Sequence, residues 1–111
     1  MSTVIDSGSQ TATPSTEHSI SSAIGTDGTY VMIVDATNLP ADGVLELRAK
    51  RKARAADSQA YAYSASFNGA APGDPLKISI PVPCAASTSL QFTLKQVGGT
   101  GAAFPWSIEK L

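Results

Sequence analysis

Six short, strand-like segments separated by clusters of turn-forming residues make up the chain from residue 29 to its end. They lie at 29–35, 44–52, 59–67, 76–82, 90–97 and 104–111. Segment 90–97 alternates most clearly, with Leu90, Phe92 and Leu94 on one face of a strand. No connection contains a helical pattern long enough for the crossover that parallel strands need. The sequence therefore predicts an all-β fold, either a small β-sandwich or a jelly-roll-like barrel.

The first two segments differ in how their apolar residues are arranged. Segment 29–35 (TYVMIVD) is almost continuously apolar and too short for a typical helix. We expect it to form a central strand that is buried on both faces. Segment 44–52 alternates instead, with Leu45, Leu47 and Ala49 on one side and charged residues on the other. This pattern predicts a strand with one solvated face.

Aromatic residues are concentrated in segment 59–67. Strict alternation would place Tyr61, Tyr63 and Phe67 on one face, together with Ala65. This stripe predicts either a contribution to the core or a stacking platform for a sugar or a partner protein. In the next segment, Leu76, Ile78 and Ile80 share one face, opposite to Lys77 and Ser79.

Two loops are dense in residues that favour turns. Residues 68–75 (NGAAPGDP) separate two of the strands. Residues 98–101 (GGTG) lie between the last two segments and lack the Lys-Ser/Thr pair that follows in a phosphate-binding loop. We therefore expect 98–101 to be a hairpin connection.

The first 28 residues have a different composition from the rest of the chain. They contain 12 Ser or Thr residues and only five large apolar ones: Met1, Val4, Ile5, Ile20 and Ile24. So few apolar side chains do not offset the entropy lost on ordering, roughly 1–2 kcal/mol per residue. We predict that 1–28 is an N-terminal arm, extended in its first half, and that 29–111 is the β-sandwich body. Residues 18–24 suit a helical turn or an edge strand equally well.

The sequence offers little material for catalysis or for metal binding. It has one histidine, His18, one cysteine, Cys84, and only 15% charged residues. The carboxylates are scattered, mostly in turns, and no Gly-x-Ser-x-Gly motif accompanies the hydroxyls. We predict a protein that is not an enzyme, with no catalytic residues, no cofactor and no metal. A membrane span and a signal peptide are likewise not expected, because no apolar run is long enough.

A basic run is the most distinctive local feature. It holds five of the eight basic residues in seven positions: Arg48, Lys50, Arg51, Lys52 and Arg54. It could bind an acidic protein surface, or it could be a solvated edge strand whose charge prevents aggregation. Nucleic acid is the less favoured partner, because no aromatic residues are interleaved and the pI is about 5.6. With Val4 and Ile5 of the arm, these residues are the candidate partner contacts.

The C-terminal sequence TLKQVGGTGAAFPWSIEKL, at 93–111, carries a resemblance. Together with TYVMIVD at 29–35 and DGVLELR at 42–48, it resembles a group of small virion structural proteins of tailed bacteriophages. Members share a TLKQ-x-x-GTG-x-x-FPW ending and an LELR-like strand. The sequence departs from the group where LELR continues as AKRK, and 1–28 is not part of the shared pattern.

The resemblance implies a capsid decoration or cement protein, or another head or tail component. It implies a location on the capsid surface of the virion after synthesis in the host cytoplasm, the major capsid protein as partner, and a homo-oligomer, by analogy a trimer. The alternative is a module that binds carbohydrate on a host surface through Tyr61, Tyr63 or Trp106. That alternative predicts at least two exposed aromatic rings on one concave face.

Overall fold

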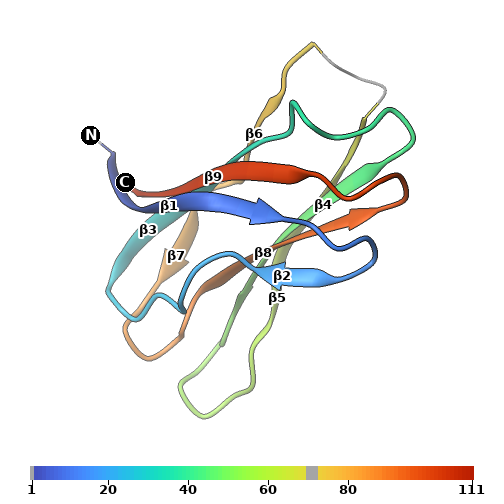
Figure 1. The fold of residues 1–111 in the computed structure, drawn as a ribbon. Helices are drawn as coiled ribbons and strands as arrows, with labels where there is room; N and C mark the ends of the chain where they lie inside the picture. The colour runs from blue at the N-terminus through green and yellow to red at the C-terminus, as the bar shows by residue number, and fades with distance from the viewer. Residues whose placement is uncertain (1, 70–72) are drawn as a thin grey trace.

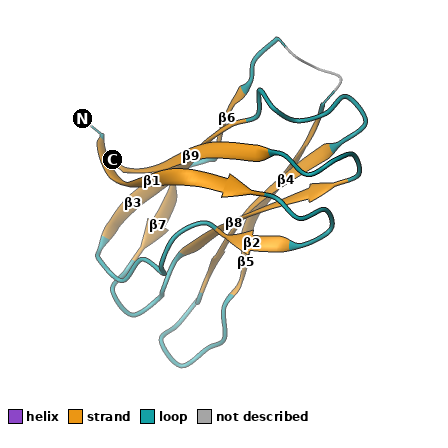
Figure 2. Cartoon of the chain, viewed as in Figure 1, coloured by secondary structure: helices purple, strands orange, loops and turns teal. Residues whose placement is uncertain are grey.

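The computed structural model describes residues 2–69 and 73–111, and two antiparallel sheets face each other across one core (Figure 1). The five-stranded sheet contains β1 (Thr3–Thr11), β9 (Ala103–Lys110), β3 (Gly28–Asp35), β6 (Leu76–Ile78) and β7 (Val82–Cys84). The four-stranded sheet contains β2 (Glu17–Ser19), β8 (Gln91–Val97), β4 (Val44–Arg51) and β5 (Ala60–Asn68). The described residues form strands and loops and no helix (Figure 2). The predicted small all-β sandwich is confirmed.

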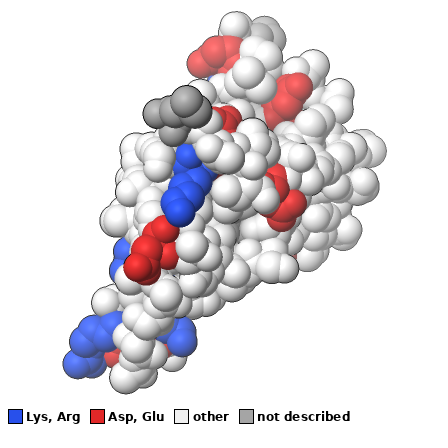
Figure 3. All heavy atoms as spheres, turned by 90° about the vertical axis from the view of Figure 1, so that its left-hand side faces the viewer, with Lys and Arg blue, Asp and Glu red and all other residues white. Residues whose placement is uncertain are grey.

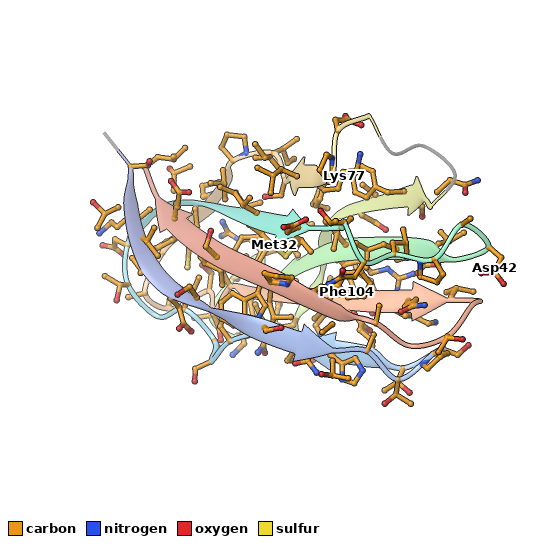
Figure 4. All side chains as sticks on the ribbon, turned by 45° about the horizontal axis from the view of Figure 1, so that its top comes forward. Met32, Asp42, Lys77 and Phe104 are labelled. Carbon is orange, nitrogen blue, oxygen red and sulfur yellow. The ribbon has the colours of Figure 1, made fainter. Side chains whose placement is uncertain are left out.

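The alternating strands supply most of the core. Leu45, Leu47 and Ala49 of β4 are fully buried, as are Phe92 and Leu94 of β8. The five-stranded sheet contributes Met32 of β3 and Phe104 of β9, both labelled in Figure 4, to the same core. Burying a Leu, Phe or Met side chain contributes about 1.5–3 kcal/mol, so the large residues at these positions hold the two sheets together. The one cysteine, Cys84, is also buried and free.

Several connections cross from one sheet to the other. Residues 98–101 join β8 in the four-stranded sheet to β9 in the five-stranded sheet, so the expected hairpin is wrong. The side chain of Gln96, fully buried, organises this crossing. Its Nε2 donates to Gly98 O at 3.0 Å and to Thr100 O at 2.8 Å, while its Oε1 accepts from Ala102 N at 3.1 Å. Because both the nitrogen and the oxygen of this buried amide have hydrogen-bond partners, the Gln96 side chain fixes the conformation of the glycine-rich segment 98–101.

The N-terminal segment is part of the sandwich, and the prediction of an extended arm is wrong. β1 pairs with β9 from Thr3 to Thr11 and forms one edge of the five-stranded sheet. Ala12, Ile20 and Ile24 are buried in the core. A Ser/Thr-rich strand can join an existing sheet edge because the ladder uses backbone groups and needs few apolar side chains.

The ambiguity at 18–24 is resolved in favour of an edge strand. β2 pairs with β8, with Glu17 opposite Lys95 and Ser19 opposite Thr93. His18 stabilises the preceding turn, since its Nε2 accepts a hydrogen bond from Thr13 N at 3.0 Å. Of the predicted loop at 68–75, residues 70–72 lie outside the described residues.

Two glycines of that loop provide a matched test of the packing. A Cβ at Gly69 would lie 1.9 Å from Pro40 O, whereas a Cβ at Gly73 would meet nothing within 4 Å. We therefore expect Gly69→Ala to lower the free energy of unfolding by about 2 kcal/mol or more, because a backbone atom must move. Gly73→Ala should change it by less than about 0.5 kcal/mol. Urea unfolding of both variants measures the difference, and equal stabilities would contradict the close approach of Pro40.

Candidate functional site

Strand β6 presents its apolar side chains to solvent. Leu76, Ile78 and the following Ile80 are 58%, 59% and 54% exposed. Ile78 pairs with Ile33 and Leu76 pairs with Asp35 in the register between β6 and β3. In β3, Met32 and Val34 point into the core, so Ile33 and its partner Ile78 lie on the outer side of the sheet. Three neighbouring large aliphatic residues are thus left outside the core.

The inward positions of this segment explain its orientation. Ser79 is 4% exposed, and its Oγ accepts from Met32 N at 2.9 Å and donates to Ile80 O at 3.0 Å. The ammonium group of Lys77 lies over the Phe67 ring, 5.1 Å from its centroid, and 3.1 Å from Asp74 Oδ1. Figure 4 shows Lys77 on β6. Because polar side chains make these inner contacts, the alternation of the strand turns the aliphatic ones outward.

The register extends this surface across neighbouring strands. The outer row beside Ile33 continues through Ser107 to Ser7, and Glu109 connects Val31 with Val4 of β1. We call this surface the apolar face; it comprises Val4, Val31, Ile33, Leu76, Ile78, Ile80 and Pro105, of which Val31 is only 8% exposed. A shallow depression of about 280 Å³ lies within it, lined by Ile33, Leu76 and Pro105 together with Asp35, Trp106 and Ser107. Exposed aliphatic side chains that lie side by side, as Leu76, Ile78 and Ile80 do, typically mark a protein contact.

The outer face of the four-stranded sheet is polar instead. A bulge between the pairs Ala49–Tyr63 and Lys50–Tyr61 adds one residue to β5 and turns Tyr61 to the outer side. The Tyr61 ring lies 5.0 Å from the guanidinium carbon of Arg48, and its hydroxyl donates to Glu17 Oε1 at 2.8 Å. This arrangement spans the sheet from β5 to β2 and is open to water, since Tyr61 is 53% exposed.

Glu17, on the edge strand β2, accepts two side-chain hydrogen bonds on this polar face. Burial alone would raise the pKa of Glu17, but hydrogen bonds from Thr93, at 2.5 Å, and Tyr61 outweigh it. The charges of Lys50 and Arg48 act in the same direction as the hydrogen bonds, so the pKa lies below its ordinary value.

The lowered pKa of Glu17 predicts a pH dependence of stability. The ionised form is favoured in the folded state, so its contribution is present above the ordinary pKa and is lost as pH falls through the folded-state pKa. Tyr61→Phe should raise the pKa of Glu17 in an NMR titration. We expect the same variant to reduce the difference in unfolding free energy between pH 7 and pH 3 by only about 0.5 kcal/mol, because the site is open to solvent. An unchanged pKa of Glu17 in this variant would contradict the hydrogen bond from the Tyr61 hydroxyl to Glu17.

The structure distributes the predicted contact residues over different surfaces. Val4 belongs to the apolar face, and Ile5 lies at a bulge of β1, 44% exposed. Arg48 and Lys50 lie on the polar face, where Arg48 pairs with Glu46 at 2.8 Å. The predicted set therefore does not form one surface.

The remaining residues of the basic run, Arg51, Lys52 and Arg54, lie toward the β4–β5 loop. Arg51 donates to the backbone oxygens of Pro83 and Lys52, and Arg54 pairs with Asp57 at 2.9 Å. Figure 3 shows Lys and Arg side chains gathered at the lower end, where this loop lies. One interpretation of the sequence was that these charges protect a sheet edge. That interpretation is wrong, because β4 is an interior strand between β8 and β5.

The aromatic residues do not form the platform that a glycan-binding module needs. Tyr61 is on the outer side of its sheet, whereas Tyr63 packs against the core, so the predicted common stripe is wrong. Trp106 also packs against the core and lies beside Gly8, where a Cβ would be 3.1 Å from its ring. Within residues 2–69 and 73–111, Tyr61 is the aromatic residue that is most exposed.

In the described part of the chain, no group of three or more His, Cys, Asp or Glu residues could hold a metal ion, and no helix could cross a membrane. Comparison with known protein families, curated proteins and solved structures found no match.

The apolar face was not assigned from the sequence, although a signal was present. Alternation in 76–82 showed which residues share a side, and the prolines at 75, 81 and 83 indicated a short strand at a sheet edge. The pattern did not show that the polar side faces inward, because that depends on contacts with Met32 and Phe67.

Proposed function

We propose that this chain is a non-enzymatic structural protein of a tailed-phage virion. Its role would be that of a capsid decoration or cement protein, made in the host cytoplasm and located on the capsid surface. The observation that carries the proposal is the apolar face, with three aliphatic side chains more than half exposed side by side. The resemblance of the C-terminal sequence supplies the kind of assembly. The partner would be the major capsid protein.

Seating this face on a protein shell would remove its aliphatic side chains from water, at about 25 cal/mol for each Å² of apolar surface. Asp35, opposite Leu76, and Glu109, between Val31 and Val4, would make a few polar contacts with the shell. The polar face would then remain in solvent. Binding of this type depends only weakly on salt, unlike binding through the basic residues of β4.

The test is to add purified protein to heads that lack it. We expect stoichiometric binding, little loss of binding between low and high salt, and a higher temperature of thermal rupture. Tails and empty membranes are the comparison samples. Absence of binding to any head would contradict the decoration role, while binding to tails alone would indicate a different virion component.

The trimer implied by the resemblance remains a prediction that the bound stoichiometry measures. The carbohydrate-binding alternative lacks a pair of exposed aromatic rings on one face among the described residues. It has no specific observation in its favour.

A further inference from the structure

Strand β5 is a long sheet edge without charge. It runs for nine residues, AYAYSASFN, and among the described residues it pairs with β4 alone. An open edge of this length offers backbone groups to any further strand, and proteins usually protect such edges with charge, proline or covering segments. Its side chains, mainly Ala, Ser and Tyr, provide no repulsion against a second uncharged strand.

The other edges of the two sheets are short or modified. β2 and β6 have three residues each. β1 is long, but it carries Asp6, whose Oδ1 accepts from the Ser7 amide at 2.9 Å and occupies a donor of the edge. β5 is thus the edge best suited to pair with another strand.

The direction of the backbone groups on β5 follows from its ladder with β4. Gly69 N donates to Gly43 O at 3.0 Å, so the residues that alternate with Gly69 face β4. Ser66 and Ser64 lie between these positions, and their N–H and C=O groups therefore point to the open edge. These two residues supply the hydrogen bonds that a further strand would use.

The side chains on the core side of the same strand are incompletely covered. Tyr63, Ala65 and Phe67 pack toward the core yet remain half-buried at the edge. In an antiparallel pairing of β5 with β5 of a second copy, Ser64 would lie opposite Ser66, and Ala65 opposite Ala65. Tyr63 of each copy would then face Phe67 of the other, the kind of aromatic cross-strand pair that stabilises sheets.

The geometry points to a two-fold dimer in which β5 of two copies pair antiparallel about Ala65. The four-stranded sheets become one continuous sheet of eight strands, and each open edge covers the other. An uncharged strand can oppose itself without like-charge repulsion, which makes a second copy the fitting occupant. This contact lies on a different sheet from the apolar face, so it does not depend on capsid binding. The dimer stands against the trimer that the resemblance implies, and the measured oligomeric state decides between them.

Sedimentation and cross-linking of the purified full-length chain test the dimer. We expect a monomer–dimer equilibrium in the micromolar range for an interface of this modest size. Ser66→Pro removes an edge-facing N–H that β4 does not use, and it should weaken the dimer about 30-fold or more because two hydrogen bonds are lost. Ser66→Ala keeps the backbone group and should leave the equilibrium unchanged.

Ala65→Cys tests the register. On the two-fold axis the new thiols face each other, so mild oxidation should give a disulfide-linked dimer on a non-reducing gel. Ser58→Cys in the β4–β5 loop is the matched exposed control and should cross-link far less. A wild-type protein that is monomeric at high concentration or trimeric would overturn the proposal, as would an unaffected Ser66→Pro dimer or equal cross-linking of the two cysteine variants.

Discussion

Ile78→Lys is expected to weaken binding to heads strongly while leaving the fold intact. Ile78 is 59% exposed, so the free energy of unfolding should change by less than about 0.5 kcal/mol. In the proposed complex the same side chain is buried, and a lysine there loses the apolar contact and places an unpaired charge in the interface. We expect the affinity to fall about 100-fold or more, which corresponds to roughly 3 kcal/mol.

Two further variants separate the causes of this effect. Ile78→Ser removes the aliphatic contact without adding charge and should weaken binding by an intermediate amount. Ala56→Lys adds the same charge in the exposed β4–β5 loop, away from the apolar face, and should bind like the wild type. Binding is measured by co-sedimentation with heads, and stability by urea unfolding. If Ile78→Lys binds normally, the apolar face is not the contact surface.

Gly8→Pro is expected to cost about 2–3 kcal/mol of unfolding free energy, equivalent to a fall in Tm of roughly 10–20 °C. Ala12 N donates to Ala102 O at 2.8 Å, so the alternate residue Gly8 also directs its N–H toward β9. A proline there removes a ladder hydrogen bond and brings ring atoms close to Trp106, which already limits the space beside Gly8.

Ser9→Pro is the matched control for this substitution. The N–H of Ser9 points away from β9 to the open edge, where proline is tolerated, and its cost should stay below about 1 kcal/mol. Gly8→Ala distinguishes the steric contribution of a Cβ near Trp106 from the loss of the N–H. Thermal unfolding followed by Trp106 fluorescence reports all three. Equal Tm values for Gly8→Pro and Ser9→Pro would mean that β1 is not paired as the register indicates.

Sequence reasoning was most accurate where side-chain alternation and burial agree. Leu45 and Leu47 in β4, and Phe92 and Leu94 in β8, were placed on one face by their spacing, and all four are fully buried. In an interior strand flanked by two others, the core covers one whole face, so a period of two is enough to identify it.

The sequence was misleading where backbone pairing or a single inserted residue decides the outcome. β1 has almost no apolar side chains inside the core, so its composition resembled that of an unpaired arm, yet its backbone completes the edge beside β9. The bulge in β5 places Tyr61 and Tyr63 on opposite faces of the sheet, and no residue type in AYAYSASF predicts this bulge. Both features depend on the partner strand and are not encoded in local periodicity.

The sequence by itself determined the all-β class and the inward faces of β4 and β8, because alternation is a local property of the chain. Only the tertiary structure decided which sheet each strand joins, that β1 belongs to the body, and that Leu76, Ile78 and Ile80 face outward. The face of segment 76–80 that turns inward is set by two contacts: the Ser79 hydroxyl accepts a hydrogen bond from Met32 N, and Lys77 lies over the Phe67 ring. Those contacts join residues far apart in the chain, and they leave the apolar face available for a partner.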